Sequence, residues 1–85
     1  MLKEQVIELI SRYESGEDNL TAADVLEELE DILDEHGDNS ATDIFLSGAA
    51  RRFVYERHEA KRYGGRADDG SDRFIENIER IVGYK

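Results

Sequence analysis

The residues that could do catalytic chemistry in this chain are few. The sequence holds two histidines, His36 and His58, five serines and no cysteine. No nucleophile-elbow pattern surrounds a serine, and no glycine-rich loop carries the lysine of a phosphate-binding loop. The Glu-x-x-His pairs of di-iron bundles are missing too, because Leu33 and Tyr55 stand three residues before the two histidines. The sequence therefore predicts no enzyme activity, no metal site and no cofactor.

Carboxylates are the abundant chemical group, and they gather on one expected helix. From residue 24 to 35, every position outside the apolar stripe is Asp or Glu, and Glu30 belongs to this run. Seven carboxylates over eleven helical steps span about 16 Å, or one charge per roughly 2.4 Å, whereas duplex DNA presents one per roughly 1.7 Å. We expect six of them to form a face that binds a basic surface: Asp24, Glu27, Glu28, Asp31, Asp34 and Glu35.

Such a face favours a non-enzymatic protein-binding module. Its mechanism would be that of a DNA-mimic inhibitor, in which an acidic helix occupies the basic groove of a nucleic-acid-binding protein. A merely solvated face is the simpler alternative, and three Lys against eight Arg is also typical of salt-adapted proteins and GC-rich genomes. Like charges three or four residues apart destabilise a helix by about 0.2–0.5 kcal/mol per pair. A run that accepts this repeatedly favours a use for the charge.

A basic and aromatic side is expected on the following helix, formed by Phe45, Arg51, Arg52, Tyr55 and Arg62. We expect its arginines to neutralise the acidic helix, within one chain or across a symmetric dimer. Two alternatives remain. Apolar residues of this helix could form the dimer interface of a self-associating structural protein, or the helix could be the recognition helix of a helix-turn-helix regulator. The net charge of -10 disfavours direct contact with nucleic acid.

Four amphipathic helices must position these faces. Apolar residues recur at intervals of three and four, and they predict helices at about 2–14, 22–36, 41–63 and 72–82. No proline interrupts them. Four such helices with short connections indicate an all-α fold, a small compact bundle in a single domain of residues 1–85.

Polar residues with capping chemistry mark the helix starts. Thr21 and Asp24 form a capping-box-like pair before the second helix, in which a hydroxyl and a carboxylate each accept a backbone N–H. Ser40 and Asp43 repeat this arrangement before the third helix. Ser71 is expected to cap the last helix.

Glycines mark the helix ends. Gly37 is expected to close the second helix in the left-handed conformation, and Gly64 with Gly65 is expected to end the third. Gly48 lies within the third helix, where it either lets another helix approach closely or marks a bend.

The net charge of -10 is unevenly divided. Residues 1–47 hold 14 acids and two bases, a balance of -12, whereas residues 48–85 hold seven acids and nine bases, a balance of +2. The absence of cysteine favours a cytoplasmic location. No apolar run exceeds three residues, so no membrane span is expected.

Overall fold

The computed structural model describes residues 1–64 and 68–84, and within those ranges it contains four α-helices and no strand. The helices are α1 (Leu2–Ser15), α2 (Ala22–His36), α3 (Ala41–Arg62) and α4 (Ser71–Val82). Each bound lies within one residue of its prediction, and the all-α bundle is confirmed. Gly65, which was expected to help end α3, lies outside the described residues.

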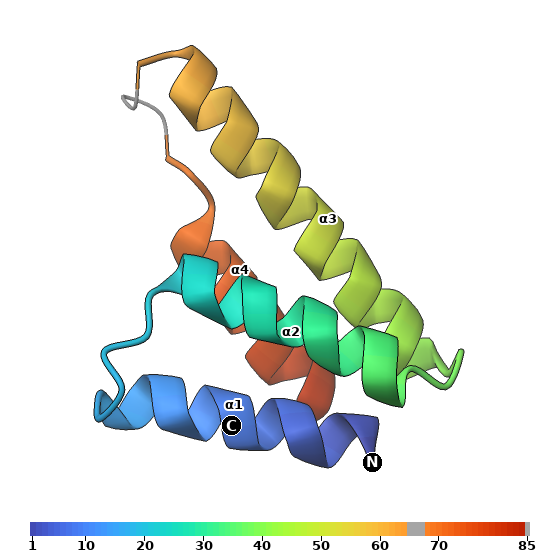
Figure 1. The fold of residues 1–85 in the computed structure, drawn as a ribbon. Helices are drawn as coiled ribbons and strands as arrows, with labels where there is room; N and C mark the ends of the chain where they lie inside the picture. Colours follow the sequence, from blue (N-terminus) through green and yellow to red (C-terminus); the bar gives the residue numbers. More distant parts are fainter. Residues whose placement is uncertain (65–67, 85) are drawn as a thin grey trace.

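α2 and α4 connect the bundle, because each of them contacts the other three helices. α1 and α2 form an antiparallel hairpin, and α3 packs against α2 and α4 (Figure 1). The C-terminal end of α3 extends beyond the other helices in this view. Two adjacent helices, α2 and α3, therefore form one side of the molecule.

The core collects the apolar stripes of all four helices. Its buried members are Leu2, Val6, Leu9, Ile10, Ala22, Val25, Leu26, Leu29, Leu46, Ala50, Phe53, Phe74, Ile75, Ile78 and Val82. Phe53 of α3 stacks on Phe74 of α4, with ring centroids 4.5 Å apart and planes 17° apart. The guanidinium of Arg57 lies 5.5 Å from the centroid of the Phe53 ring, a cation–π arrangement. The α3–α4 contact thus has an aromatic centre.

The capping box expected before α2 is confirmed. The Asp24 N–H donates to the Thr21 hydroxyl oxygen at 3.1 Å, and the Thr21 N–H donates to the Asp24 carboxylate at 3.0 Å. This pair gives partners to two backbone donors at the helix start. Asp24 therefore has a structural role.

The start of α3 follows the expected arrangement only in part. The Ser40 hydroxyl accepts the Asp43 N–H at 3.2 Å, as expected of a cap. The Asp43 carboxylate instead accepts the N–H groups of Asp38 and Asn39, at 2.9 and 2.8 Å. Asn39 has a φ of 59°, so the turn between α2 and α3 contains a left-handed residue. Asp43 ties this turn to α3.

The expectation for Gly37 is wrong, because its backbone is not left-handed. Its φ is -59° and its ψ is 135°, and Asn39 is the residue with positive φ in this turn. A glycine is still required at this position, since an added Cβ would lie 2.4 Å from the carbonyl oxygen of Leu33. Close approach to the end of α2 therefore explains the residue.

The expectation for Ser71 is also wrong. Ser71 is the first residue of α4, and the cap position belongs to Gly70, whose φ is 81°. The Ser71 hydroxyl and N–H both donate to the Asp69 carboxylate, at 2.7 and 3.0 Å. These hydrogen bonds, above all that from the hydroxyl, lower the pKa of Asp69. Ser71 thus organises the turn before α4.

Gly48 interrupts nothing, since α3 continues through it from Ala41 to Arg62. A Cβ added at Gly48 would meet no atom within 4 Å. Gly48 is exposed and borders an open hollow that it lines together with Asn77, Arg80 and Ile81 of α4.

Candidate protein-binding surface

The outer side of α2 is acidic because its inner side is committed to the core. Ala22, Val25, Leu26 and Leu29 are buried, so helical geometry turns the intervening carboxylates outward. The exposed carboxylates in the middle of the helix are Glu27, Glu30, Asp31 and Asp34, here named the α2 acidic face. None of these four makes an ion pair or a hydrogen bond with another described residue. Among the described residues, no cation balances their charge.

Two of the six expected binding residues are used inside the fold. Asp24 belongs to the capping box. Glu28 accepts a hydrogen bond of 2.6 Å from Arg12 of α1, and this bond raises the pKa of the Arg12 guanidinium. Arg12 also lies 3.6 Å from Asp18. Asp24 and Glu28 therefore serve α2 and its packing on α1, and neither belongs to the α2 acidic face.

The remaining expected residue of α2, Glu35, is exposed, and its carboxylate lies 3.8 Å from Nε2 of His36. Glu30 is the residue that the assignment of the binding face left out. It lies with Asp34 on the side of α2 that faces α3. The four-residue spacing between them, which puts both on one helix face, was the available signal.

A shallow groove of about 320 Å³ separates α2 from α3. Its apolar lining comes from Leu33, Ala50 and Val54. Its charged lining comes from Glu30 and Asp34 on one helix and from Arg51 on the other. This α2–α3 groove brings opposite charges to the same face of the molecule.

Neutralisation of α2 by α3 within one chain, which was one of the two expected pairings, does not occur. No ion pair joins α2 to α3 among residues 1–64 and 68–84. The cation that reaches α2 is Arg12, which comes from α1. Arg51 lines the same groove as Glu30 and Asp34, but it does not come within ion-pair distance of either carboxylate.

The basic and aromatic side expected on α3 is brought together only in part. Phe45 and Tyr55 are 61% and 64% exposed. Arg51 is exposed and without an ion pair in the part of the chain that the structure describes. Arg52 and Arg62, in contrast, have acidic neighbours on α3 itself, Glu56 at 2.7 Å and Glu59 at 3.8 Å.

Further apolar side chains of α3, from the stretches that were expected to form a dimer interface, join this side. Ile44 is 61% exposed, and Val54 is about half exposed. We name Ile44, Phe45, Gly48, Arg51 and Tyr55 the α3 outer face. It carries three of the large exposed apolar residues of the described chain, Ile44, Phe45 and Tyr55.

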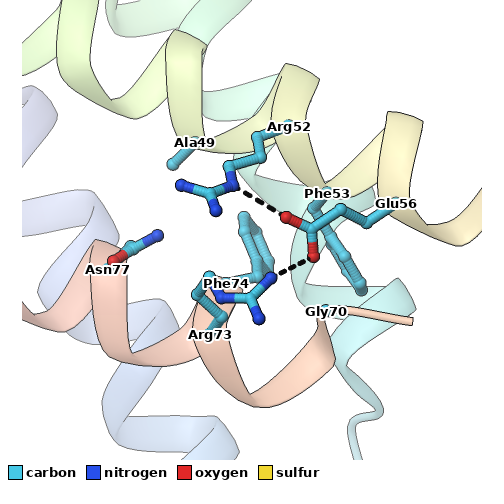
Figure 2. A pocket seen from close by; sticks show the side chains of 8 residues that line it. All are labelled: Ala49, Arg52, Phe53, Glu56, Gly70, Arg73, Phe74 and Asn77. Carbon is cyan, nitrogen blue, oxygen red and sulfur yellow. Dashed lines mark hydrogen bonds and ion pairs between the residues drawn. The ribbon is translucent and has the colours of Figure 1, made fainter. Parts of the chain in front are cut away.

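A filled contact between α3 and α4 lies behind Arg52 (Figure 2). The Glu56 carboxylate lies between Arg52 of α3, at 2.7 Å, and Arg73 of α4, at 2.5 Å. Gly70 passes so close that an added Cβ would lie 2.0 Å from Oε2 of Glu56. No room for a water molecule is left among these side chains. This contact is therefore structural.

Two features are absent from the described residues. No group of three or more His, Cys, Asp or Glu side chains there is placed to hold a metal ion. None of the helices α1 to α4 has both the length and the apolar character needed to cross a membrane.

Comparisons with protein-family models, with curated proteins and with solved structures each gave no match to this chain. Its function has to be inferred from the side chains described above.

Proposed function

We propose that this chain is a non-enzymatic protein-binding module, in which the α2 acidic face engages the basic surface of a partner. One observation carries the proposal: Glu27, Glu30, Asp31 and Asp34 are exposed and without a partner among the described residues. Nearby carboxylates with a structural role, such as Glu28 and Asp24, do have partners. The charge of the face is available for binding.

The cost of this arrangement supports a use for it. Glu27 with Asp31, and Glu30 with Asp34, are like charges four residues apart. Each such pair destabilises a helix by roughly 0.2–0.5 kcal/mol, and no cation of the described chain offsets it. A basic partner would supply that compensation.

The spacing of the charges supports a nucleic-acid-binding protein as the partner. The five exposed carboxylates from Glu27 to Glu35 span eight helical steps, or about 12 Å. That is one charge per roughly 2.4 Å, against roughly 1.7 Å in duplex DNA. The proposed action is occlusion of the partner's basic groove, with complementary charge speeding the encounter.

Direct DNA binding through α3 is less well supported. Glu30 and Asp34 line the same groove as Arg51, so a phosphate backbone that approached Arg51 would meet these carboxylates. Self-association has a specific observation in its favour, the exposed apolar residues of α3, and it is taken up below.

Affinity capture from an extract of the source organism tests the proposal. Wild type would be compared with a variant that carries Glu27→Lys, Glu30→Lys, Asp31→Lys and Asp34→Lys. The matched control carries Glu4→Lys, Glu8→Lys, Glu17→Lys and Glu76→Lys, which changes the net charge equally at exposed sites outside α2. Bound proteins would be identified by mass spectrometry.

We expect wild type and control to retain the same basic protein, and both to release it when salt is raised or duplex DNA is added. The α2 variant should not retain it although its helicity is unchanged. Equal capture by the α2 variant and the control would remove the proposal.

A further inference from the structure

The α3 outer face is a helix side that the described chain leaves uncovered. Ile44, Gly48, Arg51 and Tyr55 follow one another at helical spacings of four, three and four residues, so they lie along one line of α3. The helix packs into the core through its opposite side, by Leu46, Ala50 and Phe53. The row has two large exposed apolar side chains, Ile44 and Tyr55, and Phe45 lies next to Ile44. Exposed apolar side chains that share a helix side with an unpaired arginine are a feature of binding surfaces.

The composition of the face is that of an interface centre. Tyr, Phe and Arg are enriched at the centres of protein interfaces, where they bury large areas and leave few polar groups unsatisfied. Gly48 adds a low point between Ile44 and Tyr55, with open space where a Cβ would lie. Another helix could approach closely there.

The charges around the α3 outer face indicate which kind of partner would cover it. The α2 acidic face lies beside the α3 outer face, across the α2–α3 groove. A purely acidic partner would be attracted by Arg51 and repelled by Glu30 and Asp34. A purely basic partner would be repelled by Arg51 and attracted by these two carboxylates. An occupant that satisfies both sides must carry an acidic and a basic strip next to each other.

The chain itself carries that pattern. α2 holds seven acids and no lysine or arginine, whereas α3 holds five bases and three acids. All three acids have partners within the chain: Asp43 in the turn before α3, Glu56 between two arginines, and Glu59 beside Arg62. Arg51 and Lys61 have no ion pair among the described residues, so the charges of α3 that are left for a partner are basic.

We propose that a second copy of the chain covers the α3 outer face, in a two-fold dimer that places α2 of each copy against α3 of the other. It deepens the proposed function and rests on it in one respect: the α2 acidic face binds a basic surface, here that of a second copy. Because both interactions use the same face, a second copy and the basic partner of the proposed function compete for it. A two-fold axis along the α2–α3 groove makes both halves of the contact identical and closes the assembly. Arg51 of each copy then meets Glu30 and Asp34 of the other.

The molecule is large enough for such an interface. A stable interface buries about 800 Å² on each partner. The accessible surface of the chain is 5610 Å², so about one seventh of it would be covered. Two adjacent helices of 15 and 22 residues offer an area of this order.

Sedimentation equilibrium with a charge-swap pair tests the dimer. One variant carries Glu30→Lys and Asp34→Lys, and the other carries Arg51→Glu. Each alone places like charges across both halves of the interface, whereas an equal mixture restores opposite charges in both halves. We expect wild type to dimerise at low salt, each variant to dissociate at least about tenfold more readily, and the mixture to regain the dimer.

A second pair of variants tests the apolar part. Ile44→Ser with Tyr55→Ser should weaken the dimer at least about tenfold, because it removes the anchors. Tyr63→Ser, which alters an equally exposed residue beyond the end of α3, should leave the dimer unchanged. Circular dichroism would show that all variants keep their helices.

The outcomes separate this inference from the proposed function. A wild type that stays monomeric at millimolar concentration and low salt overturns the dimer, while capture of a basic protein through α2 would still stand. A dimer that survives in both charge variants, or that the mixture fails to restore, overturns the α2-to-α3 arrangement. If wild type captures no basic protein through α2 but still forms the charge-dependent dimer, the proposed function is removed and the dimer stands.

Discussion

Glu56 on α3 and Asp31 on α2 are both helical carboxylates, but their surroundings differ. The Glu56 side chain is 18% exposed and lies between Arg52 and Arg73, close to the backbone of Gly70 (Figure 2). Asp31 is exposed and has no partner among the described residues. A carboxylate that joins two helices is paired with arginine. On the α2 acidic face, no arginine of the described residues pairs with the carboxylates.

The difference teaches what the charge of -10 consists of. Glu28, like Glu56, pairs with an arginine of another helix: it contacts Arg12 of α1 across the α1–α2 hairpin. Four of the acids left after such pairs lie together on the α2 acidic face, and others, such as Glu4, Glu17 and Glu76, are spread over the rest of the surface. Mutation of the α2 acidic face therefore tests whether the fold needs this group of charges.

The largest effect should come from the aromatic centre of the α3–α4 contact. Phe53→Ala removes a buried ring that stacks on Phe74, and we expect it to lower the free energy of unfolding by about 3–5 kcal/mol. Urea unfolding followed by circular dichroism would measure this. Tyr55→Ala, two residues along the same helix but exposed, should change it by less than about 0.5 kcal/mol. Equal losses would mean that α3 packs differently.

A smaller loss should follow from crowding Glu56. Gly70→Ala combines a φ of 81° with a Cβ placed on the Glu56 carboxylate, and we expect a loss of about 2–3 kcal/mol. Gly16→Ala has a similar φ of 73° but open space around the new Cβ, so it should lose only about 1 kcal/mol. The difference between the two midpoints in urea measures the contact with Glu56. Equal losses would show that Glu56 can move away at no cost.

Removing the charge of Glu56 should have a still smaller effect. Glu56→Gln leaves the shape but weakens the hydrogen bonds from Arg52 and Arg73, and we expect a loss of about 1–2 kcal/mol. Glu59→Gln, one turn along α3 and 3.8 Å from Arg62, should lose less than about 0.5 kcal/mol. A double-mutant cycle of Glu56→Gln with Arg73→Ala would measure the coupling. An absence of coupling would contradict the bridging role.

Local sequence patterns were sufficient to predict the helices. Thr21, Ser40 and the apolar stripes act within one or two turns, so their effect is the same wherever the helix lies in the fold. The errors came where conformation depends on a neighbour in space. Gly37 is explained by the carbonyl of Leu33, and Ser71 by the carboxylate of Asp69.

The candidate surface was predictable as a face but not in its members. Helical spacing shows that Asp24 and Glu28 share an outer side with Asp31, but it does not show which acid will meet a cation. The partner of Glu28 lies 16 residues away, and that of Glu56 17 residues away on α4. Such pairs exist only after the helices have packed. The role of the face in binding stays a prediction.

The smallest expected effect is also the most direct test of the claim that the α2 acidic face does not stabilise the fold. A variant with Glu27→Gln, Glu30→Gln, Asp31→Asn and Asp34→Asn would be unfolded in urea beside wild type, at a concentration where both sediment as monomers. We expect a free energy of unfolding equal to that of wild type or up to about 1 kcal/mol higher, because like-charge repulsion is relieved. A value lower than wild type by more than about 1 kcal/mol would show that these carboxylates stabilise the fold, and it would contradict the claim.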